Sequence, residues 1–186
     1  IFYVRVPNFA KNPNDLFCAD HLSKLTTASL RQLSLAAGFE WIASKEAGVP
    51  VFVALKKVAS DGQIGSALPE NAPVAEQNVA ACKSALEAIL RCRRTAQDRG
   101  EAFAIFGLGP SGLFAPFFGS FDPQEIAAYL DENRTLWGSE LHGRPVGGLD
   151  LIDSLKLRHI ALAISPVYFE QVRAKLSPHG VAVYAA

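Results

Sequence analysis

The chain has 186 residues, of which 49% are hydrophobic and 19% are charged, and its 18 Lys and Arg residues balance its 18 Asp and Glu residues. Because the charges balance, the protein has no net positive charge to attract nucleic acid or an anionic membrane, and we expect neither among its partners. We expect a neutral partner or a small ligand. No apolar run reaches the roughly 18 residues of a membrane span, and the opening residues lack the regions of a signal peptide, so we expect a cytoplasmic protein.

The cysteines and methionines add two expectations. Cys18, Cys82 and Cys92 are an odd number without CxxC spacing, which disfavours a disulfide framework and a zinc site, so we expect no metal. The sequence contains no methionine, and its first residues read as the interior of a strand. We therefore expect further residues before Ile1.

The first elements are a strand, a helix and a hairpin. The alternating, β-branched opening predicts a strand over residues 1–6. Residues 21–38 place leucines at helical spacing, with Thr and Ser residues suited to capping and a terminal glycine, which predicts a helix. Residues 39–48 and 50–58 predict two strands that are joined as a hairpin.

A change of composition divides the chain. Residues 59–73 are rich in Ser, Gly, Asp, Asn and Pro and have no apolar period, which predicts a linker. The part before it, residues 1–58, has too few elements for an independent domain. The part after it, residues 74–186, opens with a long helix and is predicted to be a second domain.

The second part alternates strand and helix signals. We predict a strand at 101–109, a helix at 111–118, a strand at 126–133, a loop at 141–150, a strand at 158–166, a helix at 167–176 and a strand at 180–186. Such alternation predicts an α/β fold with a parallel sheet between helices. We expect a small Rossmann-like domain of about four strands.

A glycine motif follows the first strand of this domain. The stretch FAIFGLGPSGLF runs an apolar segment into Gly107, Gly109 and Gly112. In dinucleotide-binding folds the first glycine permits a tight turn, the second lets backbone N–H groups approach a phosphate, and the third allows close helix packing. Asp131 ends the next predicted strand, where such folds place the acid that binds a ribose hydroxyl, about 20 residues beyond the motif.

Four more residues complete the candidate nucleotide contacts. Pro110 and Ser111 lie within the motif, Asn133 follows Asp131, and His142 lies in a glycine-rich loop. The same motif also serves simply to turn a strand into a helix, and a sheet of about four strands is small for a dinucleotide fold. A nucleotide or phosphate ligand, NAD itself and a structural turn therefore all remain open.

Several stretches, taken in chain order, carry a resemblance to a known family. They are FYVRVPNF, DLFCADHLS, LRQLSLAAGFE, VPVFVALKKV, FAIFGLGPSGLF, AAYLDEN and HGRPV. Together they resemble the C-terminal half of the sugar C-methyltransferases, which use S-adenosylmethionine to methylate nucleotide-linked deoxysugars. The resemblance covers nearly the whole chain. It implies the end of a class I methyltransferase sheet, followed by the family's C-terminal Rossmann-like domain.

The resemblance also implies catalytic residues. The family's final catalytic His falls on His21 and its Glu on Asp20, whereas its Tyr and first His fall on Cys18 and Ala19. His21 would be the base that removes a proton beside a keto group, and Asp20 would orient its imidazole. The implied cofactor is S-adenosylmethionine, with its main binding residues outside this chain. The implied acceptor is a nucleotide-linked sugar or a related small molecule, and the fragment alone would be inactive.

Two other function classes remain open. Because Cys18 and Ala19 replace the family's pair, the chain could be a non-catalytic nucleotide-binding module. The glycine motif with Asp131 alone would suit an NAD-dependent oxidoreductase. Asp20 and His21 also have a purely structural interpretation, since short polar residues before a helix cap its exposed N–H groups.

Overall fold

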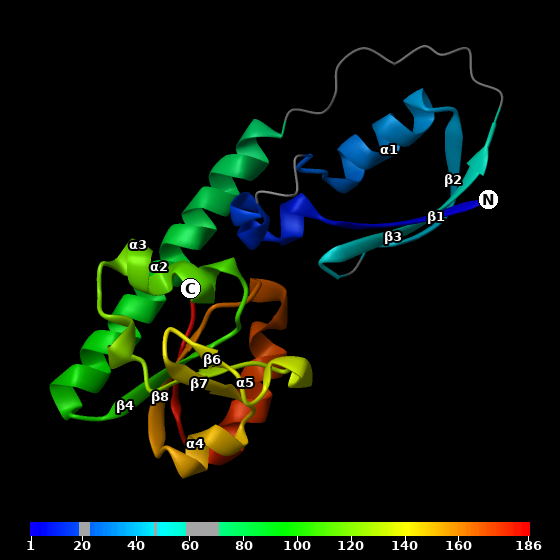
Figure 1. The fold of residues 1–186 in the computed structure, drawn as a ribbon. Helices are drawn as coiled ribbons and strands as arrows, with labels where there is room; N and C mark the ends of the chain where they lie inside the picture. Colours follow the sequence, from blue (N-terminus) through cyan, green and yellow to red (C-terminus); the bar gives the residue numbers. More distant parts are fainter. Residues whose placement is uncertain (19–22, 47, 59–70) are drawn as a thin grey trace. The chain divides into compact units, whose positions relative to one another are not determined.

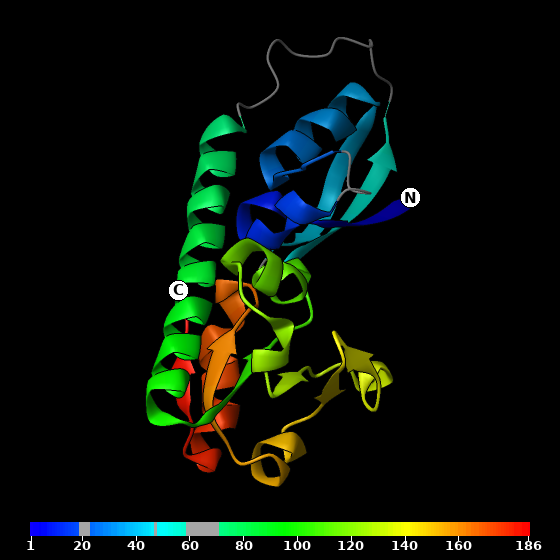
Figure 2. The same ribbon diagram turned by 60° about the vertical axis from the view of Figure 1, so that its left-hand side comes forward.

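The computed structural model describes residues 1–18, 23–46, 48–58 and 71–186. The chain divides into two compact units, unit 1 (residues 1–80) and unit 2 (residues 81–186). The fold is α/β, with a three-stranded antiparallel sheet in unit 1 and a six-stranded, mostly parallel sheet in unit 2 (Figures 1 and 2). Most of the predicted linker 59–73 lies outside the described residues, and the proposed boundaries at 58 and 74 stay predictions.

Unit 1 contains the predicted strand, helix and hairpin. Strand β3 (Pro50–Lys57) lies between β1 (Phe2–Pro7) and β2 (Phe39–Lys45) and is antiparallel to both. Helix α1 (Thr27–Ala36) is shorter than the predicted helix. It begins where it does because Thr26 forms a reciprocal capping box with the helix's third residue.

Helix α1 covers one face of this sheet. Its Leu30 packs with Val51, Val53 and Leu55 of β3, and all four side chains are buried. Complete burial of a Leu or Val side chain stabilises a fold by about 1.5–3 kcal/mol. These alternate residues of β3 therefore hold the helix to the sheet.

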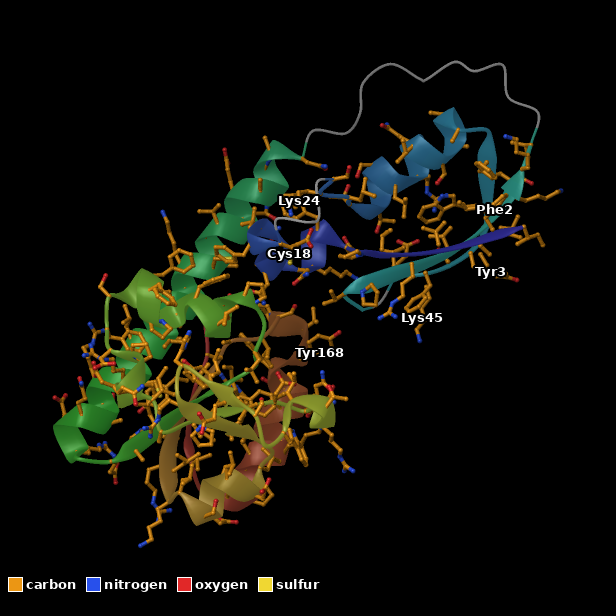
Figure 3. All side chains as sticks on the ribbon, in the orientation of Figure 1. Phe2, Tyr3, Cys18, Lys24, Lys45 and Tyr168 are labelled. Carbon is orange, nitrogen blue, oxygen red and sulfur yellow. The ribbon has the colours of Figure 1, made fainter. Side chains whose placement is uncertain are left out.

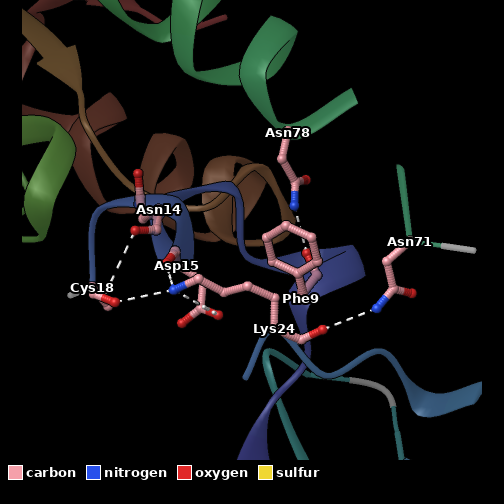
Figure 4. A network of polar contacts seen from close by, with 7 residues as sticks. All are labelled: Phe9, Asn14, Asp15, Cys18, Lys24, Asn71 and Asn78. Carbon is pink, nitrogen blue, oxygen red and sulfur yellow. Dashed lines mark hydrogen bonds and ion pairs between the residues drawn. The ribbon is translucent and has the colours of Figure 1, made fainter. Parts of the chain in front are cut away.

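Lys24 links the segment that precedes α1 to residues 15–18. The ammonium of Lys24 donates to the carbonyls of Asp15, at 2.5 Å, and Cys18, at 3.0 Å (Figure 4). Asn71 donates to the Lys24 carbonyl at 3.1 Å, and Asn78 donates to the Phe9 carbonyl at 2.7 Å. The start of the long helix is thereby bonded to the segment between β1 and α1.

Unit 2 is built on a sheet with strand order β6-β7-β5-β4-β8-β9. The helices and strands of this part, in chain order, are α2 (Ala72–Arg99), which begins in unit 1, β4 (Ala102–Phe106), α3 (Pro110–Gly119), β5 (Ala128–Leu130), β6 (Glu140–Leu141), β7 (Arg144–Gly147), α4 (Asp150–Ser154), β8 (Leu157–Leu162), α5 (Phe169–Leu176) and β9 (Ala182–Tyr184). Neighbouring strands are parallel, except that β6 is antiparallel to β7.

The predictions of about four strands and of a loop at 141–150 were wrong. That segment contains β7 and the turn between β6 and β7, and it ends at the start of α4. At the turn, His142 and Gly143 have φ values of 52° and 71°. The sequence signal is weak because β7 reads Arg-Pro-Val-Gly and lacks a β-branched run.

The sheet of unit 2 is buried on both faces. On one side Phe103 and Ile105 of β4 pack with Cys92 of α2. On the other side Ala104 and Phe106 of β4 belong to a second core cluster, which includes residues of α4 and α5. No helix in the described part of the chain is long and apolar enough to cross a membrane.

Candidate functional site at the carboxyl ends of the unit 2 strands

The strand order of unit 2 places a topological switch point beside β4. From β4 the chain moves to β5 and β7 on one side, and it then crosses to β8 and β9 on the other. In open α/β sheets, ligands bind outside the carboxyl ends of the strands at such a point. The loops that follow β4, β5 and β8 therefore outline the candidate site.

Two neighbouring hollows lie at this edge of the sheet. The first, of about 230 Å³, is lined by Phe106, Gly107, Asp131, Glu132, Ile164, Tyr168, Gln171 and Val172. The second, of about 540 Å³, is lined by Phe106, Asp131, Glu132, Arg134, Trp137, Gly148, Leu149, Asp150 and Lys175. The two hollows share the end of β4 and the two carboxylates that follow β5.

Two glycines of the motif are required by packing. Gly107 has a φ of 106°, and a Cβ there would lie 2.4 Å from Cγ2 of Ile164. A Cβ on Gly112 would lie 2.0 Å from the carbonyl oxygen of Gly107. Both contacts are closer than real Cβ atoms come. These glycines therefore make the tight turn and let α3 approach β4, whatever the turn binds.

The other residues of the motif form the start of α3. Gly109 caps the helix with φ −67° and ψ 175°, and Pro110 and Ser111 are its first two residues. The Gly109 carbonyl accepts from the backbone N–H groups of Gly112 and Leu113 at 3.0 Å each. Of the predicted motif residues, Gly107 lines one of the two hollows, whereas 109–112 line neither.

Asp131 joins the loops that follow β4 and β5. One carboxylate oxygen accepts from the backbone N–H of Leu108 at 2.9 Å, and the other accepts from that of Asn133 at 2.8 Å. Asn133 in turn caps the next 3-10 turn. A carboxylate has about four lone-pair sites, so Asp131 can hold both loops and still accept hydrogen bonds from ligand hydroxyls.

His142 lies elsewhere in unit 2. Its Nδ1 is 2.9 Å from the hydroxyl of Tyr129, and its ring packs edge-on against Phe117 at 5.6 Å. Burial raises the pKa of Tyr129 to about 12, so this phenol stays protonated at neutral pH. His142 lines neither hollow, and the structure does not bring it together with Gly107 and Asp131.

Sequence reasoning missed most of the residues that line the hollows. Glu132 forms a 2.5 Å ion pair with Lys175 of α5. The Trp137 indole donates to the Asp131 carbonyl at 2.8 Å and lies under the Arg134 guanidinium, 5.4 Å from the ring centre. Only two features of the sequence could have indicated these lining residues. Glu132 is next to Asp131, and tryptophan is rare in the chain.

The predicted catalytic residues His21 and Asp20 lie outside the described residues. Their neighbour Cys18 is partly exposed, and its Sγ lies 3.8 Å from the Asn14 carbonyl oxygen. Within the described ranges, no three His, Cys, Asp or Glu side chains are grouped so that they could hold a metal ion.

Comparison with known proteins assigns no family to the chain. No protein-family model matches it, and no curated protein matches it either. The function is therefore inferred from the chemistry of the hollows and from the resemblance of the sequence motifs.

Proposed function

We propose that the two hollows of unit 2 bind a nucleotide, and that the chain is the C-terminal portion of a methyltransferase of the sugar C-methyltransferase type, whose acceptor is a nucleotide-linked sugar or a related small molecule. The observation that carries the proposal is the pair of carboxylates, Asp131 and Glu132, shared by both hollows at the carboxyl ends of the strands.

The side chains around these carboxylates suit the three parts of a nucleotide. The first hollow offers Tyr168 and the apolar Val172 to a base. The second offers the cation Arg134 to a diphosphate, and Lys175, which is paired with Glu132, lies in the same hollow. Between them, Asp131 and Glu132 are hydrogen-bond acceptors for ribose hydroxyls. In this proposal the phosphates lie away from the glycine turn, where packing already accounts for Gly107 and Gly112.

The remaining parts of the proposal come from the resemblance. In it, residues 1–58 are the end of a class I methyltransferase sheet, residues 59–73 are a linker, and residues 74–186 are a connecting helix with a Rossmann-like domain. His21 would take the proton from the carbon beside the acceptor's keto group, with Asp20 orienting its imidazole.

The cofactor S-adenosylmethionine supplies the methyl group in this family. Within the described part of unit 1, β1 is followed by Asn8, whose side chain accepts from the backbone N–H of Ala10, and by the buried Phe9. The resemblance implies that the main binding residues of the cofactor lie outside this chain.

Ligand titration tests the nucleotide site. We would titrate the 186-residue chain with dTDP and, separately, with NAD by isothermal calorimetry, and repeat this with Tyr168→Ala. Val167→Ala is the matched control, because Val167 neighbours Tyr168, is 50% exposed and lines neither hollow. We expect dTDP to bind, Tyr168→Ala to weaken it about tenfold, and the control to leave it unchanged.

Other outcomes of these titrations would favour other functions. Binding of NAD alone would favour an oxidoreductase, and binding of neither ligand would leave the glycine motif a structural turn. Methyl transfer is tested in a longer form of the protein that binds S-adenosylmethionine. Loss of transfer in His21→Ala with dTDP affinity retained would support catalysis, whereas dTDP binding with no turnover in the unaltered protein would support a non-catalytic module.

A further inference from the structure

Helix α5 brings side chains to both hollows of unit 2. Tyr168, labelled in Figure 3, precedes the first residue of this helix and lines the first hollow, and Lys175 in the last turn lines the second. Residues seven positions apart lie on the same face of a helix, about 10 Å from each other along its axis. Glu132 lines both hollows. A ligand that extends from Tyr168 into the second hollow therefore meets Glu132 and Lys175 together.

The guanidinium of Arg134, one cation of the second hollow, is positioned by an aromatic ring. It lies 5.4 Å from the ring centre of Trp137, whose indole donates to the Asp131 carbonyl. A Cβ on Gly148 would lie 2.6 Å from Cζ2 of this indole, so the ring packs closely against the backbone there. A stacked guanidinium keeps its N–H donors at the edge of its plane. Arg134 can therefore bind a phosphate without leaving its ring.

The other cation, Lys175, is paired with a carboxylate. Its Nζ lies 2.5 Å from Oε1 of Glu132, and the two side chains are 41% and 51% exposed. Such an exposed ion pair adds little to stability, because water weakens the attraction and two long side chains lose freedom to form it. Lys175 can therefore leave Glu132 at small cost when another anion enters the hollow.

The charges that line the second hollow favour this release. The carboxylates of Asp131, Glu132 and Asp150 outnumber the cations of Arg134 and Lys175 by one. The phosphate groups of a nucleotide add more negative charge and several strong acceptor oxygens. Because these carboxylates repel a phosphate, its binding is favourable only where cations contact it directly. The ammonium of Lys175 becomes such a contact once it leaves Glu132.

We propose that a nucleoside diphosphate binds by exchange, in which the Lys175 ammonium moves from the Glu132 carboxylate to a phosphate oxygen. Glu132 thus competes with the ligand for Lys175 and limits the affinity for phosphate. The exchange also frees the Glu132 carboxylate to accept from a sugar hydroxyl. A nucleoside without phosphates leaves the pair intact. The inference rests on the proposed nucleotide site and identifies the ion pair that controls its phosphate affinity.

A double-variant cycle tests the exchange. The 186-residue chain, Glu132→Gln, Lys175→Gln and the double variant are titrated by calorimetry with dTDP and, separately, with thymidine, which has no phosphate. We expect Glu132→Gln to tighten dTDP about fivefold, because glutamine still accepts a hydrogen bond but no longer holds the ammonium. Lys175→Gln should weaken dTDP about fivefold. In that background Glu132→Gln should change neither ligand by more than about twofold.

Asp150→Asn is the matched control, because it removes one negative charge from the same hollow and leaves the pair of Glu132 and Lys175 in place. Its effect on dTDP should be the same with and without Lys175→Gln. The exchange would be overturned, with the nucleotide site retained, if Glu132→Gln gave no gain, an equal gain in both backgrounds, or an equal gain for thymidine. Binding of neither ligand to any of these chains would overturn both the exchange and the nucleotide site.

Discussion

The central strands β3 of unit 1 and β4 of unit 2 have similar sequences and different surroundings. Both are runs of apolar residues. Phe103 to Phe106 of β4 are all buried, because helices pack on both faces of its sheet. In β3, Val51 and Val53 are buried while Phe52 between them is 43% exposed. Similar apolar runs therefore occur in a strand that is buried on both faces and in one that has α1 on one face only, within the described residues.

The largest expected difference between the units is in thiol reactivity. Burial raises the pKa of Cys92 in unit 2 to about 12, from an ordinary value of 9.0. At pH 8 its reactive thiolate is therefore about a thousandfold scarcer than in an unfolded chain. We expect iodoacetamide to modify the partly exposed Cys18 of unit 1 first, and Cys92 only after unfolding.

Mass spectrometry of timed samples would measure both sites. The Cys92 rate should rise with pH over the range in which the protein stays folded, because more of the thiolate forms. Labelling of native Cys92 at pH 8 as fast as Cys18 would contradict the tight packing of α2 on the sheet.

A glycine substitution should unfold unit 2 selectively. Gly112→Ala puts a Cβ against the Gly107 carbonyl, so α3 must move, and we expect a loss of about 3 kcal/mol. Gly100→Ala is the control, because a Cβ there meets nothing within 4 Å and only its φ of 63° opposes the change. We expect about 1 kcal/mol for the control.

Urea unfolding followed by tryptophan fluorescence can assign such losses to a unit. Trp41 lies in unit 1 and Trp137 in unit 2, and the chain has two tryptophans. A Trp41→Phe background therefore reports unit 2, and a Trp137→Phe background reports unit 1. Equal losses for Gly112→Ala and Gly100→Ala would show that the turn tolerates a side chain.

Core truncations should sharpen the comparison of the two sheets. Leu162 of β8 is fully buried, and we expect Leu162→Ala to cost about 4 kcal/mol, because helices on both faces limit collapse of the cavity. Leu55 of β3 is 6% exposed in a sheet covered by one helix, so Leu55→Ala should cost about 2–3 kcal/mol. The reverse order, measured by urea unfolding in the two tryptophan backgrounds, would refute this account.

The smallest effect concerns the start of α1. Thr26→Ala removes one half of the capping box with Ser29 and should cost about 1 kcal/mol in unit 1. The control Thr95→Ala, within α2, should change stability by less than about 0.5 kcal/mol. The fluorescence of Trp41 reports the first change, and a loss no larger than the control's would show that α1 is held by its packing alone.

Strong local patterns predicted much of the fold, and weak ones did not. The sequence predicted the β2–β3 hairpin, the long helix α2 and the strand before Gly107. In each of them, the spacing of the apolar residues and the position of a glycine indicate the same element. The strands β6 and β7 were missed because β6 has only two residues and β7 contains Pro145, so neither shows the apolar pattern of a strand. A two-residue strand such as β6 is specified by its neighbour and carries no signal of its own.

The candidate site was predicted in part, for a related reason. Gly107 and Asp131 carry a motif, and they meet at one hollow. Tyr168 and Lys175 come from the opposite end of the unit 2 sequence and reach the hollows through the crossover from β7 to β8. No local sequence feature distinguishes these two residues, because the strand order of the sheet brings them to the hollows. His21 and Asp20 stay predictions.

The last strand, β9, has a consequence for proteolysis. His159, which is 1% exposed, bonds Glu101 through Nε2 at 2.6 Å and the Tyr184 hydroxyl through Nδ1 at 3.0 Å. A carboxypeptidase that removes residues 184–186 would take away one of its two partners and shorten the edge of the sheet. Trimming of a few residues from the carboxyl terminus should therefore open a path for water to an imidazole in the interior of unit 2.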